Sequence, residues 1–230
     1  MTRHRAPRPG HIVLAQRIAQ MLAGTIVMGV GVALLLLAKF GLLPLDVLHA
    51  AVAARAGWTI GGAIIAVQAL LLICYLPLRI RPGLGTITAS VIPAVTCDVL
   101  IGILPTPEGT VPRLLLLAAG GTCFAIGTAA YLGAGLGSLP RDGVMLAVHQ
   151  RRGYSLATIR ITADIACLLL GAMIIGPVLA ARTGVLGIGS VLLALLLGPL
   201  IARLRSFFER VQTPTVELVP TPTSPKEATP

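Results

Sequence analysis

Residues 18–38 read IAQMLAGTIVMGVGVALLLLA and contain no charged side chain. Because an α-helix needs roughly 20 apolar residues to cross the ~30 Å hydrocarbon core of a bilayer, this stretch predicts a membrane span. Four more uncharged, largely apolar runs follow, at 56–78, 114–140, 165–181 and 183–202. Only 11% of the 230 residues are charged, against about 25% in soluble domains. The sequence therefore predicts an all-α, polytopic integral membrane protein and excludes a soluble enzyme or a secreted disulfide domain.

Six transmembrane helices are expected, at about 15–38, 57–78, 84–104, 112–133, 156–178 and 184–204. The third is the weakest, because it contains Pro93 and Asp98. One set of connecting segments holds 14 of the 18 Lys and Arg residues, and such segments face the cytoplasm. Both termini are therefore predicted to be cytoplasmic.

The two ends of the chain differ from its apolar middle. Residues 1–14 form a basic cytoplasmic segment, and residues 206–230 form a Pro/Thr-rich tail that we expect to be disordered. The membrane domain is expected over 15–205. The net charge of +10 points to anionic lipid headgroups as partners rather than to nucleic acid, since the basic loops lack stacking aromatic residues.

An internal repeat appears when the chain is shifted against itself by 96 residues. GLLPLD (41–46) then aligns with GSLPRD (137–142), and eight of the twenty residues in 41–60 are identical to their counterparts. After a further shift of eight, GLGT (83–86) matches GIGS (187–190). The repeats, at about 15–104 and 112–205, each hold three spans. An odd number of spans inverts the second copy relative to the first, as in many secondary transporters.

A short helix is expected in each repeat between its first and second spans, from Pro44 to Gly57 and from Pro140 to Gly153. Proline suits a first helical turn, and Asp46 and Asp142 could accept its free backbone N–H groups. Twelve residues cover ~18 Å, too little to cross the bilayer. Each short helix is therefore either interfacial or re-entrant. In the re-entrant case both would point their N-termini at a shared cavity.

The stretches 41–49 (GLLPLDVLH), 83–86, 137–145 and 187–190 resemble the YczE-like family of bacterial integral membrane proteins, which is related to the YitT family. The resemblance covers about 15–205, and its most specific element is P-R-D-G-x-M at 140–145. The family more often has Gly-Pro-Trp-Asp and Gly-Pro-Arg-Asp, whereas this chain inserts Leu43 and Leu139 and has Leu45 in place of the aromatic residue. The resemblance implies a multi-pass protein of the bacterial plasma membrane, and it supplies no chemistry because the family is largely uncharacterised.

Asp164 is the strongest candidate for a functional residue. It lies ten residues beyond Tyr154, which places it ~15 Å deep, at mid-membrane. An ionised carboxylate at this depth is energetically costly, so such a residue is a candidate for function. Its repeat counterpart, Gln68, lies at the same depth from the other face. Arg160, one turn before Asp164, could pair with it or extend back to the headgroups. The alternative is a structural hydrogen bond between helices.

We therefore predict one cavity lined by Asp164, Gln68 and Arg160 and flanked by the helix starts at Pro44–Asp46 and Pro140–Asp142. His49 and His149 are interpreted as interfacial and non-liganding. No catalytic motif, metal-ligand set or cofactor fingerprint is present.

The leading prediction is a non-enzymatic permease or exporter for a small solute. The alternatives are an accessory protein that supports a partner enzyme or membrane complex and, less favoured, a lipid-binding or scramblase-like protein. Homo-oligomers are left open.

Overall fold

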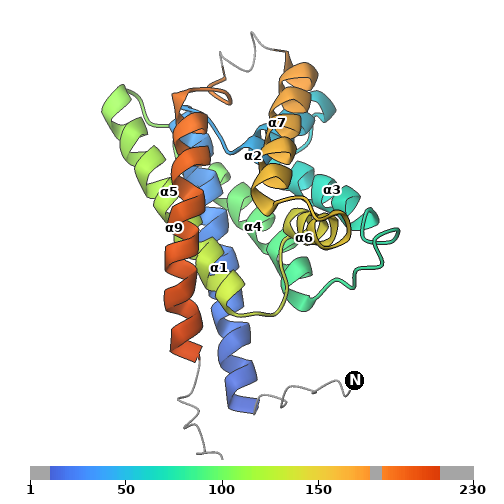
Figure 1. The fold of residues 1–230 in the computed structure, drawn as a ribbon. Coiled ribbons are helices and arrows are strands. Elements are labelled where there is room, and N and C mark those ends of the chain that lie inside the picture. Colours follow the sequence, from blue (N-terminus) through green and yellow to red (C-terminus); the bar gives the residue numbers. More distant parts are fainter. Residues whose placement is uncertain (1–10, 177–182, 213–230) are drawn as a thin grey trace, which may run out of the picture.

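The structure is a computed structural model that describes residues 11–176 and 183–212, and within these ranges it is built of helices joined by turns and loops (Figure 1). The elements are α1 (His11–Ala38), α2 (Pro44–Ala56), α3 (Ile60–Ile73), α4 (Leu84–Ile103), α5 (Thr110–Gly133), α6 (Pro140–Arg152), α7 (Leu156–Ile175) and α9 (Ile188–Gln212).

Five helices, α1, α4, α5, α7 and α9, are long and apolar enough to cross a membrane. The second predicted span, 57–78, is wrong as a single straight helix. Its helical part, α3, has 14 residues, or ~21 Å, and is bent by 114° relative to α2. Thr59 starts α3 separately, because its hydroxyl accepts the Gly62 N–H at 3.0 Å, and Pro77 cannot continue a helix. Counted together, α2 and α3 make a broken sixth span.

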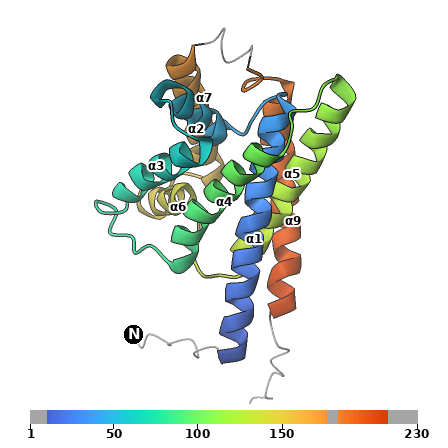
Figure 2. The ribbon, with the colours of Figure 1, turned by 180° about the vertical axis from the view of Figure 1, so that it is seen from behind.

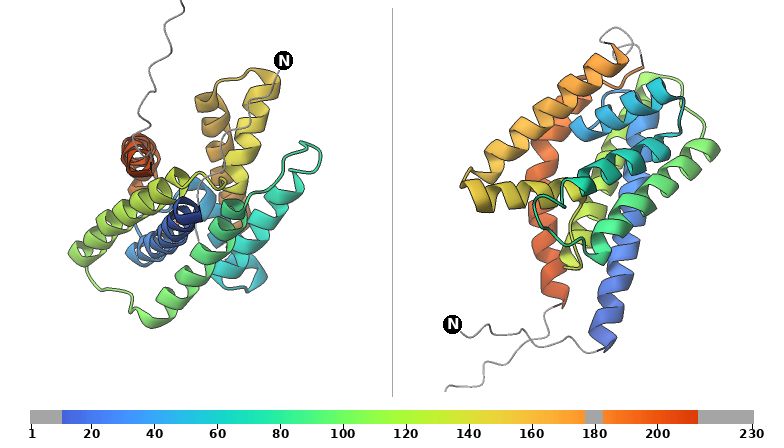
Figure 3. Two further views of the ribbon diagram at one scale, coloured as in Figure 1. Left: turned by 90° about the horizontal axis from the view of Figure 1, so that it is seen from below. Right: turned by 90° about the vertical axis from the view of Figure 1, so that its right-hand side faces the viewer.

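The helices fall into two groups. In the first, α1 packs against both α4 and α5, and α5 packs against α9. In the second, α2 packs against α3 and α7, and α6 packs against α3 and α7. The main contact between the groups is made by α3 with α4. Figures 2 and 3 show the second group beside α1, α5 and α9, with α1 beginning and α9 ending at the same end of the molecule.

The antiparallel pair α1 and α5 meets at glycines. A Cβ on Gly31 would lie 2.5 Å from Phe124 N and 2.8 Å from Gly120 O, and a Cβ on Gly24 would lie 2.9 Å from Gly127 O. Small residues let helix backbones approach this closely in membranes. Gly24 and Gly31 are the repeat counterparts of Gly120 and Gly127, and each packs against the counterpart of the other: Gly24 meets Gly127, and Gly31 meets Gly120.

The loops that precede the two short helices are held by the opposite half of the chain. The Gly189 N–H donates to Phe40 O at 2.9 Å, and the Gly85 N–H donates to Leu136 O at 3.0 Å. Gly41 (φ +121°) and Gly137 (φ +141°) occupy equivalent loop positions with backbone angles that favour glycine. The GLGT and GIGS motifs therefore each hold the start of the other repeat's short helix.

The short helices begin at Pro44 and Pro140, as predicted, and Gly57 and Gly153 follow their ends in the left-handed conformation. The expected aspartate caps are wrong, because neither helix start has a side-chain cap hydrogen bond. Asp46 bonds to His49 instead, and Asp142 lies at ion-pair distance from Arg141.

The first and last described helices extend a little beyond residues 15 and 205, the limits of the membrane domain, which stay a prediction. Helix α1 begins at His11, before residue 15, and α9 continues to Gln212, beyond residue 205. The predictions for 1–10 and for the tail 213–230 lie outside the described residues, as do residues 177–182 between α7 and α9.

Candidate functional site

A small cavity of about 70 Å³ lies between the two helix groups, roughly the space of a few water molecules. Helices of both groups line it, including the first turns of α2 and α6. Six polar or charged side chains share this lining with apolar ones: Asp46, His49, Gln68, Arg141, Arg160 and Asp164. The sequence predicted four of these six as site residues.

Repeat-related positions make up most of the cavity wall. Fourteen of the twenty lining residues form seven pairs at the spacings of 96 or 104 residues found in the sequence. The pairs are Met28/Phe124, Leu43/Leu139, Leu45/Arg141, Ile64/Arg160, Gln68/Asp164, Ala89/Leu193 and Pro93/Leu197.

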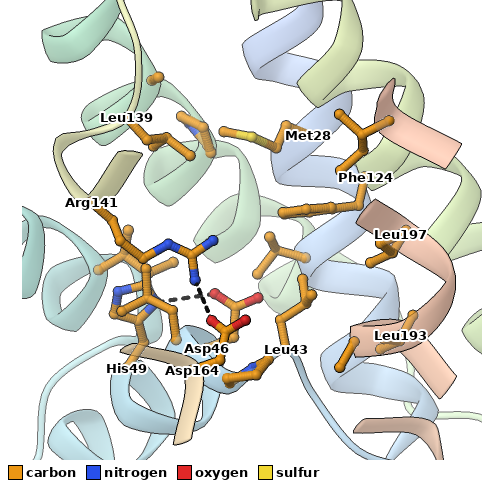
Figure 4. Close-up of a pocket in the computed structure, with 18 of the residues that line it drawn as sticks. Met28, Leu43, Asp46, His49, Phe124, Leu139, Arg141, Asp164, Leu193 and Leu197 are labelled. Atoms are coloured by element: carbon orange, nitrogen blue, oxygen red, sulfur yellow. Dashed lines mark hydrogen bonds and ion pairs between the residues drawn. The ribbon is translucent and has the colours of Figure 1, made fainter. Parts of the chain in front are cut away.

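Asp164 accepts a hydrogen bond from Arg141, with Nη1 to Oδ1 at 2.9 Å (Figure 4). Both side chains are largely buried, at 18% and 20% exposed. Charge-assisted bonds of this kind are strong, and the pair holds the start of α6 against α7. The sequence analysis missed Arg141 as the partner of Asp164. The arginine of the P-R-D-G-x-M motif was the available signal, because it replaces the apolar Leu45 of the first repeat.

Arg160 also approaches Asp164, with Nε to Oδ2 at 3.9 Å across one helical turn. Its side chain is 44% exposed, so the guanidinium is both near the carboxylate and open to the surroundings. Of the two predicted positions, pairing and extension to the headgroups, the structure adopts the first.

His49 does not lie where the sequence predicted it. Instead of lying at an exposed interface, it is 3% exposed and lines the cavity. Its Nδ1 is 3.1 Å from Asp46 Oδ1, since the two residues share one face of α2. A carboxylate at Nδ1 fixes the orientation of an imidazole and leaves the other nitrogen for a further partner. The Nε2 atom of His49 is buried without a hydrogen-bond partner.

Gln68, also 3% exposed, places its Oε1 in the protein interior without a hydrogen-bond partner. Arg141 Nε is buried and likewise forms no hydrogen bond. Buried polar atoms in proteins are nearly always partnered by protein groups or by water. These three atoms all belong to residues that line one cavity.

Two predicted flanking residues lie outside the cavity wall. Pro140 is fully buried in the packing of α6, and Asp142 Oδ1 lies 3.7 Å from Arg141 Nε. Their counterparts Pro44 and Asp46 do line the cavity. The two short helices thus begin at the same space but present different side chains to it.

Asp98 is bonded to the protein at the contact between α3 and α4. Its Oδ1 accepts the Gly61 N–H at 2.7 Å, and a Cβ on Gly61 would lie 2.5 Å from Ala94 O. This bond joins the two helix groups on one side of the cavity.

A metal centre has no support in the described residues, where no group of three or more His, Cys, Asp or Glu side chains is suitably placed. What the arrangement offers is a set of polar and charged side chains around an internal space. Such a space suits reversible binding of a small molecule.

Apolar helices of spanning length, arranged around an internal polar cavity, define a polytopic α-helical membrane protein. The chain belongs to the family of unknown function DUF6198, whose model matches residues 15–206.

Two similar proteins cover most of the chain. An uncharacterized protein of Haemophilus influenzae is 29% identical over 184 residues, which are 80% of this chain and 81% of the relative. The uncharacterized membrane protein YczE of Bacillus subtilis is 28% identical over 178 residues, or 76% of this chain and 79% of the relative. These relatives fit the YczE-like resemblance found in the motifs. No solved structure matches the chain.

Proposed function

We propose that this protein is a permease or exporter that moves a small solute across a bacterial plasma membrane by alternating access. The observation that carries the proposal is the cavity with unpartnered buried polar atoms, which lies between two groups of helices. In secondary transporters built from inverted repeats, the substrate site lies at the repeat interface near mid-membrane.

The proposal includes an inverted repeat of three spans in each half. The exchanged glycine contacts support it, because Gly24 meets Gly127 while Gly31 meets Gly120. A twofold axis between antiparallel α1 and α5 would exchange these two contacts. The equivalent bonds at Phe40 and Leu136, and the seven paired positions of the cavity wall, support the same axis.

This axis would exchange α1 with α5 and α4 with α9 in the first group, and α2 with α6 and α3 with α7 in the second. The contacts between the two groups, however, are not symmetric. Helix α3 packs on α4, with Gly61 bonded to Asp98. The equivalent helices α7 and α9 form no comparable interface among the described residues, and a Cβ on Gly198, the counterpart of Ala94, would have open space around it. We infer from these contacts that the α3–α4 side is the closed side of the cavity and the α7–α9 side is the open one. In the second state of the transport cycle these roles are exchanged.

The charge distribution sets the direction of this opening. With both termini in the cytoplasm, as the 14 basic residues of one set of segments indicate, the start of α7 lies on the cytoplasmic side. The described conformation then faces inward. We expect anionic lipids around the basic loops, no enzymatic activity, no cofactor and no nucleic-acid partner, with homo-oligomers left open.

The first test compares the solutes inside and outside cells that contain the protein, cells that lack it and cells that contain Asp164→Asn. We expect at least one small solute to change its distribution with the wild-type protein only. An unchanged solute profile would favour the accessory role and overturn the proposal.

The second test asks whether the α7–α9 side closes. In a background without Cys74, Cys97, Cys123 and Cys167, Ala157→Cys and Gly198→Cys are combined, and each single variant is the control. These two positions are the repeat counterparts of Gly61 and Ala94, which meet on the α3–α4 side. A short bifunctional reagent should cross-link the pair in membranes and stop solute movement. Transport that continues after complete cross-linking would contradict alternating access.

A further inference from the structure

We propose that the cavity binds a small zwitterionic solute with an aliphatic tail, of the chemical class of the aliphatic α-amino acids. The inference rests on the proposed function, since it names the substrate class of that site. It follows from the two different walls of the cavity, from its unpartnered polar atoms and from its balance of charges.

The cavity has a polar wall and an apolar wall. Figure 4 shows Asp46, His49, Arg141 and Asp164 gathered on one side, while Phe124, Leu193 and Leu197 face them from the other. The polar wall comes from the group of α2, α3, α6 and α7, and the apolar wall comes mainly from α1, α5 and α9. A ligand that satisfies both walls is polar at one end and apolar at the other.

The polar wall offers hydrogen-bond donors and acceptors close together. Arg141 Nε forms no hydrogen bond, and Asp142 Oδ1 lies 3.7 Å from it, beyond hydrogen-bond distance. The first turns of α2 and α6 add backbone N–H groups, because neither helix start is capped by a side chain. These groups suit a carboxylate. Gln68 Oε1, an unpartnered buried acceptor, and the carboxylate of Asp46 suit an ammonium group.

The charges that line the cavity compensate one another. Among the lining side chains, Arg141 and Arg160 are balanced by Asp46 and Asp164, and His49 faces the same space. Asp142 lies outside the wall, 3.7 Å from Arg141. A ligand with a net charge would leave one charge unbalanced in a poorly solvated space, which is costly. A zwitterion adds no net charge and still supplies partners of both signs. The ligand must be small, and because the described cavity of about 70 Å³ is smaller than an amino acid with an aliphatic tail, the two helix groups must move apart to admit it.

The test measures binding to the purified full-length protein in detergent, by thermal stabilisation and by displacement of radiolabelled L-leucine. Four probes separate the features of the proposal: L-leucine itself, glycine without the tail, 4-methylpentanoate without the ammonium group and 3-methylbutylamine without the carboxylate. We expect L-leucine to bind at least about tenfold more tightly than the others, since each of them leaves buried polar groups unpaired or the apolar wall empty. Equal binding of the anion or the amine, or no binding of any probe, would overturn the proposal.

Variants localise the binding. Gln68→Leu and Arg141→Leu should each weaken L-leucine binding about tenfold or more, whereas Thr122→Val, on an exposed face of α5 outside the cavity, should not change it. The melting temperature without ligand shows whether each variant is folded. Binding unchanged in both folded cavity variants would contradict the assignment.

The outcome is separable from that of the proposed function. Transport of a different solute class would refute the zwitterion and leave the permease standing. Binding of L-leucine without transport would do the reverse.

Discussion

Helices α2 and α6 start from nearly the same sequence and end in the same way, yet they bring different chemistry to the cavity. Both begin with proline and end before a left-handed glycine. In α2 the cavity receives Asp46 and His49, whereas in α6 it receives Arg141, and Asp142 stays outside the wall. The residues that shape the backbone are shared between the repeats, and those that face the cavity differ.

The same contrast holds on the helices that follow. Gln68 of α3 is the counterpart of Asp164 of α7, and Ile64 is the counterpart of Arg160. The charged members lie on α7 and the neutral members on α3. All the ion pairs of the cavity except that of Asp46 and His49 therefore belong to the second repeat.

The largest effect is expected where the shared framework is broken. Gly31→Ala places a Cβ 2.5 Å from Phe124 N, and a backbone atom cannot move aside without separating α1 from α5. We expect a loss of about 1–3 kcal/mol or more, measured as a lower melting temperature and a smaller monodisperse fraction in detergent. Gly102→Ala is the matched control on α4, since a Cβ there meets nothing within 4 Å. A stable Gly31→Ala protein would mean that α1 and α5 pack differently.

The next effect concerns the charge found only in the second repeat. Asp164→Asn keeps a hydrogen-bonding side chain for Arg141 but removes the charge, so it should leave the protein folded and reduce solute movement at least about tenfold. Asp164→Leu should instead lower the melting temperature, because it leaves Arg141 without its 2.9 Å partner. If Asp164 is only a structural residue, the asparagine variant will transport normally while the leucine variant is unstable.

A double-mutant cycle sharpens the Arg141–Asp164 pair. Arg141→Leu gives position 141 the same residue type as Leu45, its counterpart in the first repeat. Alone, this change leaves Asp164 with the more distant Arg160. The double variant Arg141→Leu, Asp164→Leu should be more stable than the sum of the single losses predicts, with a coupling of about 0.5–3 kcal/mol. Additive losses in melting experiments would show that the two residues do not interact.

A smaller effect should distinguish the two aspartates of the short helices. Asp46→Asn removes the charge that orients His49 inside the cavity, so we expect solute affinity to fall by about tenfold. Asp142→Asn changes a residue outside the wall, 3.7 Å from Arg141, and its effect should be several-fold smaller. Equal effects in the same uptake assay would mean that the cavity uses both helix starts alike.

The smallest perturbation tests the orientation of the two repeats. Arg55 and Arg151 are repeat-related, exposed and near the ends of α2 and α6. In the cysteine-free background, Arg55→Cys and Arg151→Cys should react with an impermeant maleimide from opposite sides of the membrane, with little effect on folding. Labelling from the same side would refute the inverted repeat.

Much of the fold can be predicted from the sequence, because the bilayer imposes simple local conditions. Uncharged runs of sufficient length predict the long helices, and Pro44, Gly57, Pro140 and Gly153 set the bounds of the short ones through local backbone preferences. The repeat spacing pairs Gln68 with Asp164, and the structure brings both to one cavity. These features depend on hydropathy and on backbone conformation within a few residues, so they can be read along the chain.

Tertiary structure alone decided which side chains meet. Arg141 and Asp164 are 23 residues apart, and their contact depends on how α6 packs against α7, which no local pattern fixes. The burial of His49 follows from the packing of α2 on α7, and the bend between α2 and α3 brings Gly61 to Asp98. The difference between the α3–α4 and α7–α9 sides also lies beyond the sequence. Repeat symmetry predicts equal contacts, whereas a folded chain adopts one packing of its two helix groups at a time.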